Sequence, residues 1–358
     1  MIQLHANKRR RAAIGVLALA LAGPVLAAPG HTLAGGPVNG PLVVHGAYPA
    51  DDPEIPGDLL TVQSGGHTTA LVKNVFGAGG LAASPHGDAL AIAQETHGLW
   101  TVKSTGRGLH RLVATPRSQG RNTLEVDAVA WSPDGLTVAF AVDAAVPPAM
   151  GGPSVVAHRD PAAGVYFTTA DGRAPVFLAT SAQLGAVDGA GAPLPITRLS
   201  FSSDGGTVAV STSRVRNGVR TPVVLLVDSG SGKTVYVVSG GRDGVFDPSP
   251  GSPLLAYVSG RQGAAPGVDP GTALHTLDKS GDRVLLRTHD TLRGPVWAPN
   301  GTSIAYSRFS YAPRGDSPIV NDLRAVDVSS RRVRTILGPG APRYGLWTAL
   351  AWLPAPGI

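Results

Sequence analysis

The sequence predicts an all-β protein, a single six-bladed β-propeller of four-stranded antiparallel blades. Three observations support this prediction. A hairpin with a Ser-Pro-Asp-Gly turn recurs along the 358 residues. A second hairpin with a glycine-containing or polar turn alternates with it, and a unit of four strands repeated about every 50 residues is typical of a propeller blade. Finally, the chain ends on one first strand and begins with the strands that this last blade lacks.

The first hairpin is clearest in AVAWSPDGLTVAFAV, residues 128–142. Pro133 presets φ for the first central turn position, Asp134 can accept hydrogen bonds from turn amides, and Gly135 can take a positive φ. The residues after the turn alternate as in a strand. The positions equivalent to Pro133 are Pro85, Ser203, Pro248, Pro299 and Pro354. Large rings recur just before the turn, where we expect them to fill the gaps between blades; they are Trp131, Phe201, Phe246, Trp297 and Trp352.

The second hairpin follows each first hairpin and completes a blade. Its copies start at Asp58, Leu99, Val165, Val223, Ala273 and Leu323. The last blade is expected to be composite. The strand near Trp352 supplies its first strand, and residues 41–48 together with the hairpin from Asp58 supply the other three. Pairing of N- and C-terminal strands in this way leaves no open sheet edge at the seam.

The N-terminal segment predicts export. Residues 8–11 are basic, residues 12–22 are apolar and residues 25–27 form a small-residue cleavage site, which is the layout of a signal peptide. An uncleaved anchor is the alternative. We therefore expect a signal peptide at 1–27, a flexible linker at 28–37 and the propeller at 38–358. The protein is expected to be periplasmic or extracellular, not membrane-spanning after cleavage, and monomeric.

Composition excludes several classes of partner and site. Removal of residues 1–27 leaves 26 Lys and Arg against 24 Asp and Glu, so the charge does not indicate a nucleic-acid partner. The chain contains no cysteine, which excludes disulfides, thiolate metal sites and a lipid-modified cysteine. No cofactor is expected.

The turn motif resembles that of a known repeat family. Trp131-Ser132-Pro133-Asp134-Gly135 followed by Val138-Ala139-Phe140, with weaker copies at five other sites, resembles the TolB-like propeller repeat, a Pro-Asp variant of WD-type repeats. The resemblance covers roughly residues 38–358 and implies the propeller fold. TolB carries an α/β domain ahead of its propeller, for which we expect no room here, and the Gly-His to Trp-Asp pattern of true WD repeats is absent. Function therefore has to be argued from the site.

Strand order predicts which face of the propeller carries the binding site. With strands A to D running outward, the A–B and C–D turns share one face, and the B–C and inter-blade D–A loops share the other. The long segments all fall on the second face, which we call the loop face; they are residues 143–163, 181–195, 260–271 and 309–321. Loops on a rigid scaffold are the usual place for binding. Neutral drift in loop length is the alternative.

Arginine is the characteristic side chain of the loop face. Arg242 and Arg293 lie four residues before the aromatic of strand A, near the expected channel mouth, and Asp127 holds that position in blade two. Several guanidinium groups there could hold a carboxylate, a phosphate or an acidic peptide. The alternative is that they pair with loop aspartates such as Asp243 and only keep the loops soluble. The candidate ligand-binding residues are Arg214, Arg216, Arg242, Arg261, Arg293, Arg308 and Arg314.

The sequence contains no assembled catalytic motif. Residues 229–234, SGSGKT, lack the first glycine of a phosphate-binding loop, and there is no G-x-S-x-G elbow. His45 and His97 end B strands near the loop face, and with Glu95 they are weak candidates for a metal site, because a propeller channel can collect ligands from different blades.

The leading hypothesis is an exported, non-enzymatic binding platform for an envelope or extracellular protein or an acidic ligand. The alternative is a propeller enzyme of the polysaccharide lyase or lactonase type with a channel-bound divalent metal.

Overall fold

The computed structural model describes most of the region predicted to form the propeller. The described residues are 39–47, 57–63, 66–75, 78–94, 97–114, 124–144, 163–173, 175–260, 272–311, 318–338 and 346–355. The predicted signal peptide at 1–27 and linker at 28–37 lie outside them. Within these ranges, no helix has the length and apolar character needed to cross a bilayer.

The described strands form six antiparallel sheets of four, as predicted. Blade one contains β4 (Ala78–Ala83), β5 (Ala89–Gln94), β6 (Gly98–Lys103) and β7 (His110–Val113). Blade two contains β8 (Leu124–Trp131), β9 (Thr137–Ala144), β10 (Gly164–Thr169) and β11 (Val176–Thr180). Blade three contains β12 (Arg198–Phe201), β13 (Thr207–Arg216), β14 (Val219–Asp228) and β15 (Thr234–Ser239).

The remaining blades have the same order of strands. Blade four contains β16 (Gly241–Phe246), β17 (Leu255–Gly260), β18 (Thr272–Asp278) and β19 (Gly281–Thr288). Blade five contains β20 (Thr291–Trp297), β21 (Ser303–Tyr311), β22 (Pro318–Asp327) and β23 (Val333–Leu337). Blade six contains β24 (Leu346–Pro354), β1 (Asn39–Ala47), β2 (Gly57–Val62) and β3 (Thr68–Val75). Neighbouring first strands contact one another from β4 through β8, β12, β16 and β20 to β24 and back to β4, which closes the ring.

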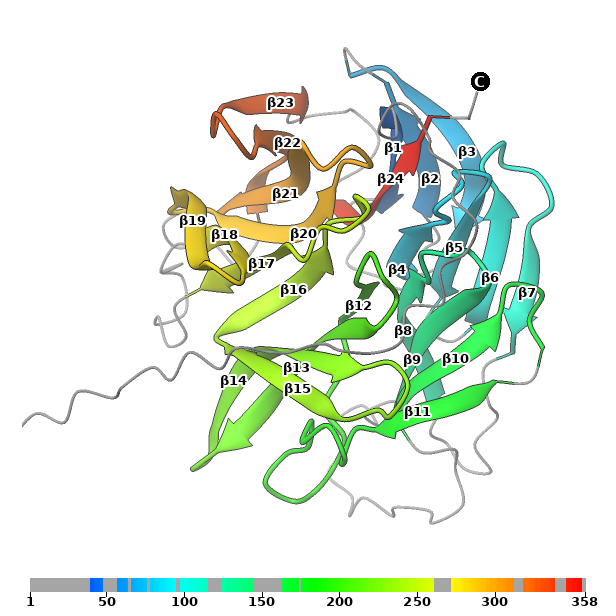
Figure 1. The fold of residues 1–358 in the computed structure, drawn as a ribbon. Coiled ribbons are helices and arrows are strands. Elements are labelled where there is room, and N and C mark those ends of the chain that lie inside the picture. The colour runs from blue at the N-terminus through cyan, green and yellow to red at the C-terminus, as the bar shows by residue number, and fades with distance from the viewer. Residues whose placement is uncertain are drawn as a thin grey trace, which may run out of the picture. The chain divides into compact units, whose positions relative to one another are not determined.

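The seam of the ring is the composite blade that the sequence predicts. Strand β24 pairs antiparallel with β1, with Trp352 opposite Leu42 and Leu350 opposite Val44. In Figure 1 the red β24 lies beside the blue β1. The indole Nε1 of Trp352 donates to the carbonyl of Gly40 at 3.0 Å. The N-terminal strands therefore receive their first strand from the other end of the chain.

The A–B turns have the hydrogen bonds that their sequence predicts. Gly135 has a φ of 71°, and its N–H donates to the carbonyl of Ser132 at 3.0 Å. Oδ1 of Asp134 accepts from Ser132 Oγ at 2.5 Å and from the N–H of Leu136 at 3.0 Å. The side chain thus satisfies groups that the tight reversal leaves without a backbone partner.

The hydrophobic core lies between neighbouring blades. Val138, Ala139, Phe140 and Ala141 are all buried, although they alternate between the two faces of β9, because each blade is covered by a neighbour on both sides. The rings before the turns fill these interfaces as expected. The indole of Trp297, for example, donates from Nε1 to the carbonyl of Val245 in blade four at 3.1 Å.

The sheet order also fixes the two faces of the ring. Because the strands are antiparallel in the order A to D, every A strand begins on the loop face and every B strand ends there. The described part of that face includes the connection at 181–197 and the extended β13–β14 hairpin around residues 216–219. Residues 145–162, 261–271 and 312–317, which hold three of the predicted long loops, lie outside the described residues.

Candidate functional site

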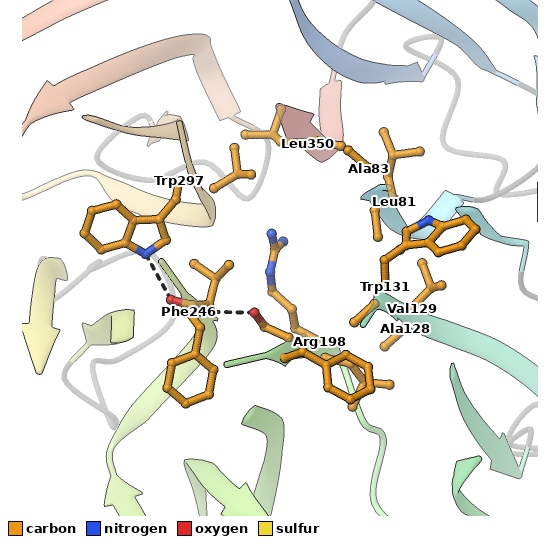
Figure 2. Close-up of a pocket in the computed structure, with 18 of the residues that line it drawn as sticks. Leu81, Ala83, Ala128, Val129, Trp131, Arg198, Phe246, Trp297 and Leu350 are labelled. Atoms are coloured by element: carbon orange, nitrogen blue, oxygen red, sulfur yellow. Dashed lines mark hydrogen bonds between the residues drawn. The ribbon is translucent and has the colours of Figure 1, made fainter. Parts of the chain in front are cut away.

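A cavity of about 170 Å³ lies at the centre of the ring. It is lined by residues of all six first strands, β4, β8, β12, β16, β20 and β24. Figure 2 shows apolar side chains such as Leu81, Val129 and Leu350 around its wall, with the indole of Trp297 at one side. Among the residues that line the cavity, only Arg198 is charged.

Arg198 begins β12 and extends toward the centre of the ring (Figure 2). Its Nη1 lies 3.9 Å from the position that a Cβ on Gly294 of β20 would take. Its Nε is buried and has no hydrogen-bond partner. Burial lowers the pKa of Arg198, and the charge of Asp243 raises that pKa in part. An arginine stays protonated despite such a shift, so the cavity holds a full positive charge.

Bulges shape the loop-face end of the first strands. The pairing register shifts between Val126 and Ala128 in β8, between Arg242 and Val245 in β16, and between Arg293 and Val296 in β20. In the last two strands, Asp243 and Gly294 have positive φ values of 53° and 57°. Bulges of this kind redirect side chains at the rims of closed sheets. Asp127, Arg242 and Arg293, the residues predicted for the mouth, lie within or beside these bulges.

A pair of carboxyl groups lies at the loop-face end of blade two, with Asp143 buried and Asp127 half-buried. Asp143 ends β9 with 4% of its surface exposed, and its Oδ2 accepts from the N–H of Ile196 at 2.8 Å. Burial, followed by the hydrogen bond with Asp127, raises the pKa of Asp143 to about 9. Burial also raises the pKa of Asp127, and burial followed by the charge of Asp127 raises that of Glu125. One proton is therefore held between Asp127 and Asp143 at neutral pH.

The predicted arginines differ in what they contact. Arg293 is exposed and makes no hydrogen bond or ion pair within the described residues. Arg216 is exposed at the β13–β14 hairpin, whereas Arg214 donates from Nη2 to the carbonyl of Leu184 at 2.8 Å. The guanidinium of Arg242 lies against β17. Its Nη2 is 3.1 Å from the position that a Cβ atom would occupy on Gly260, the last residue of that strand. Two further candidates, Arg261 and Arg314, lie outside the described residues.

Arg308 belongs to an ion-pair network in blade five. Its Nε and Nη2 donate to the two carboxylate oxygens of Asp322 at 3.0 and 2.8 Å, and its Nη1 donates to Asp290 at 2.9 Å. Arg324 donates from Nη2 to the same Asp322 at 3.0 Å. The hydrogen bonds and charge of Asp322 and Asp290 raise the pKa of Arg308. This arginine holds the D–A connection before blade five against strands β21 and β22.

The histidines do not assemble a metal centre among the residues that are described. His45 is 3% exposed, with Nε2 at 3.2 Å from the carbonyl oxygen of Val75, and burial lowers its pKa. His97 is exposed, and its carbonyl accepts from Nε1 of Trp100 at 3.0 Å. Glu95 lies outside the described residues. Within those residues, no group of three His, Asp or Glu side chains is placed to hold an ion.

Two residues of this site, Arg198 and Asp143, were not predicted from the sequence. Arg198 lies three residues before Phe201, whereas the pattern drawn from the other blades pointed to the fourth position, occupied by Thr197. Counting residues outward from the A–B turn of blade two pairs Glu125 in β8 with Asp143 in β9. Two acidic residues opposite each other at the end of a hairpin are unusual, and this pairing is the signal in the sequence that points to Asp143.

Comparison with known proteins establishes the fold. No protein-family model matches the sequence, and no curated protein does. Among solved structures, TolB from Acinetobacter baumannii superposes with a TM-score of 0.56 at 17% identity, covering 88% of this chain and 67% of that one. Putative TolB from Agrobacterium tumefaciens superposes with a TM-score of 0.50 at 14% sequence identity, covering 81% of this chain and 95% of that one. A putative 6-phosphogluconolactonase from Bacteroides uniformis superposes with a TM-score of 0.44 at 12% sequence identity, covering 87% of this chain and 99% of that one. The chain is a six-bladed β-propeller structurally similar to that of TolB.

Proposed function

We propose that this protein is a non-enzymatic binding platform that recognises a protein or an acidic ligand on the loop face, around the channel mouth. One observation carries the proposal. Consecutive blades three, four and five each carry an arginine within the first three residues of strand A, namely Arg198, Arg242 and Arg293. The exposed Arg293 has no intramolecular acceptor among the described residues, so its guanidinium is available to a ligand. Guanidinium groups bind carboxylates in a bidentate manner.

The proposal places the protein outside the cytoplasm. The signal-peptide pattern at residues 1–27 supports export, and the closed ring needs no second subunit to cover a sheet edge. The expected partner is therefore an envelope or extracellular protein, or an acidic small molecule, bound by a monomer.

The test compares two double variants of equal charge. Arg242→Gln/Arg293→Gln removes the mouth arginines, and Arg283→Gln/Arg287→Gln removes two exposed arginines from the outer strand β19. A partner is captured from envelope extract with the wild-type protein, identified by mass spectrometry, purified and titrated against all three proteins. We expect the mouth variant to weaken binding at least about tenfold and the outer-strand variant to leave it unchanged.

Two results would contradict the proposal. Equal affinity of the mouth variant and the wild type would remove the arginines from the site. Cleavage of a lactone or an acidic polysaccharide by the same preparation, dependent on added Mn²⁺ or Ca²⁺, would replace the platform with the propeller-enzyme alternative.

A further inference from the structure

The wall of the central cavity is polar and apolar in about equal parts, and Arg198 is its one charged side chain. No hydrogen bond or ion pair joins Arg198 to any other residue in the described part of the chain, and its Nε is buried. Asp243 acts on Arg198 through its charge only, because its Oδ2 accepts from the N–H of Gly294 at 3.2 Å and no contact ion pair forms. Arg198 is partly buried, and a charged donor whose Nε is buried without an acceptor is costly to the folded protein.

Two other polar side chains of the wall form hydrogen bonds within the propeller and none with Arg198. Oγ of Ser200 accepts from the N–H of Phe246 at 3.0 Å, and Oγ1 of Thr197 donates to the carbonyl of Ser211 at 3.4 Å. Arg198 is the only charged side chain of the wall, and the indole Nε1 of Trp131 is a second donor of the wall without a partner in the described part of the chain. The planar array of guanidinium donors matches the two oxygens of a carboxylate.

The size and chemistry of the wall define the rest of the ligand. A cavity of about 150 Å³ lined by apolar side chains is large enough to hold benzene. The channel cavity of about 170 Å³ is of that size, and Leu81, Val129, Val296 and Leu350 supply its apolar surface. A ligand that fills it should carry one anionic group and an apolar body of about six carbon atoms.

We propose that the channel is a binding site for a monocarboxylate with a compact apolar body, whose carboxylate is held by Arg198. The inference rests on the proposed function, because it assigns a chemical class to the acidic ligand that the mouth of the channel admits. It deepens that function by placing the recognised carboxylate inside the ring, whereas Arg242 and Arg293 contact what lies outside it.

The first experiment titrates the purified protein with benzoate, benzamide and inorganic phosphate by calorimetry. Benzoate has the charge and the ring, benzamide has the ring without the charge, and phosphate has the charge without the ring. We expect benzoate to bind about 10- to 100-fold more tightly than benzamide or phosphate, the factor that a charge-assisted hydrogen bond supplies. Equal affinity for all three would overturn the proposal, as would the failure of both benzoate and the carboxylate peptide described below to bind.

The second experiment uses variants of the wall. Arg198→Met keeps a long side chain without the charge, and should lose the preference for benzoate over benzamide. Ala83→Leu narrows the cavity (Figure 2) and should weaken both ligands, while Arg287→Gln on β19 is the control that should change neither. Because Arg198→Met removes a partly buried charge that has no ion-pair partner among the described residues, we expect its melting temperature to equal or exceed that of the wild type. A lower melting temperature with unchanged benzoate binding would show that Arg198 is structural.

The last arm distinguishes the source of the carboxylate and separates the two proposals. The peptide Ala-Ala-Phe and its C-terminal amide are titrated beside benzoate. A preference for the free acid form of the peptide identifies a chain terminus as the ligand, and binding of benzoate alone identifies a free acid; either supports the site. If neither binds while Arg242→Gln/Arg293→Gln still abolishes partner binding, the channel site fails and the binding platform stands.

Discussion

The carboxyl pair of Asp127 and the buried Asp143 makes the stability of the propeller depend on pH, and Asp143→Asn should remove most of that dependence. In the wild type, Asp143 is protonated in the folded state because burial and its hydrogen bond with Asp127 raise its pKa to about 9. An asparagine amide can accept from the N–H of Ile196 and donate to Asp127 without carrying a proton that titrates. The substitution therefore keeps these hydrogen bonds and removes the proton whose binding couples folding to pH.

The sign and size follow from the two states of Asp143. In the unfolded chain its pKa is about 4, so above that pH the unfolded state releases a proton that the folded state keeps. The free energy of unfolding contributed by this group is then complete below pH 4 and falls by about 1.4 kcal/mol per pH unit until about pH 9. Between pH 5 and pH 7 the loss is about 3 kcal/mol, an upper limit because Asp127 shares the proton.

Urea unfolding at pH 5, 6, 7 and 8 measures the effect. The free energy of unfolding of Asp143→Asn should decline less with pH than that of the wild type, and the variant should be the more stable protein at pH 8. Asp204→Asn is the control. Its hydrogen bond with Ser202 lowers the pKa of Asp204, so its contribution is constant above pH 5 and its curve should run parallel to the wild type. Parallel curves for Asp143→Asn and the wild type would refute the shared proton.

Two further substitutions test the architecture. Trp352→Ala removes a buried ring at the seam, together with the Nε1 group that donates to Gly40. Urea titrations should show a free energy of unfolding that is lower by about 3–5 kcal/mol. A loss below about 1 kcal/mol would mean that the seam does not limit stability. Asp322→Ala leaves Arg308 and Arg324 without their shared buried carboxylate and should cost about 3–5 kcal/mol, measured in the same way, whereas Asp327→Ala in an exposed turn of the same blade should cost far less.

The fold could be predicted from the sequence because its determinants are local and repeated. Each A–B turn encodes its own reversal, as Asp134 and Gly135 show, and the number of such turns gives the number of blades. The composite blade followed from counting strands at both ends, and the pairing of Trp352 with Leu42 confirms it. None of these inferences required knowledge of which side chains meet across the ring.

The site could be predicted only in part, because it depends on contacts between blades. Strand order puts the starts of β16 and β20, close to Arg242 and Arg293, on the same face. It could not show that Arg308 pairs with Asp290 and Asp322, since the first of these belongs to the preceding inter-blade connection. Nor could it show that Arg198 reaches the centre of the ring, because this depends on where β12 begins relative to the bulged strands around it.

The pairing of β24 with β1 has a consequence for how the protein folds. An open array of repeats can lose its terminal unit and keep the rest, but a ring joined across a separation of more than 300 residues has no outermost repeat to lose. Closure brings together the most distant parts of the polypeptide, which costs loop entropy and makes the final step slow. We therefore expect the folded ring to resist partial unravelling, and hydrogen exchange to report one global opening that protects all six sheets alike.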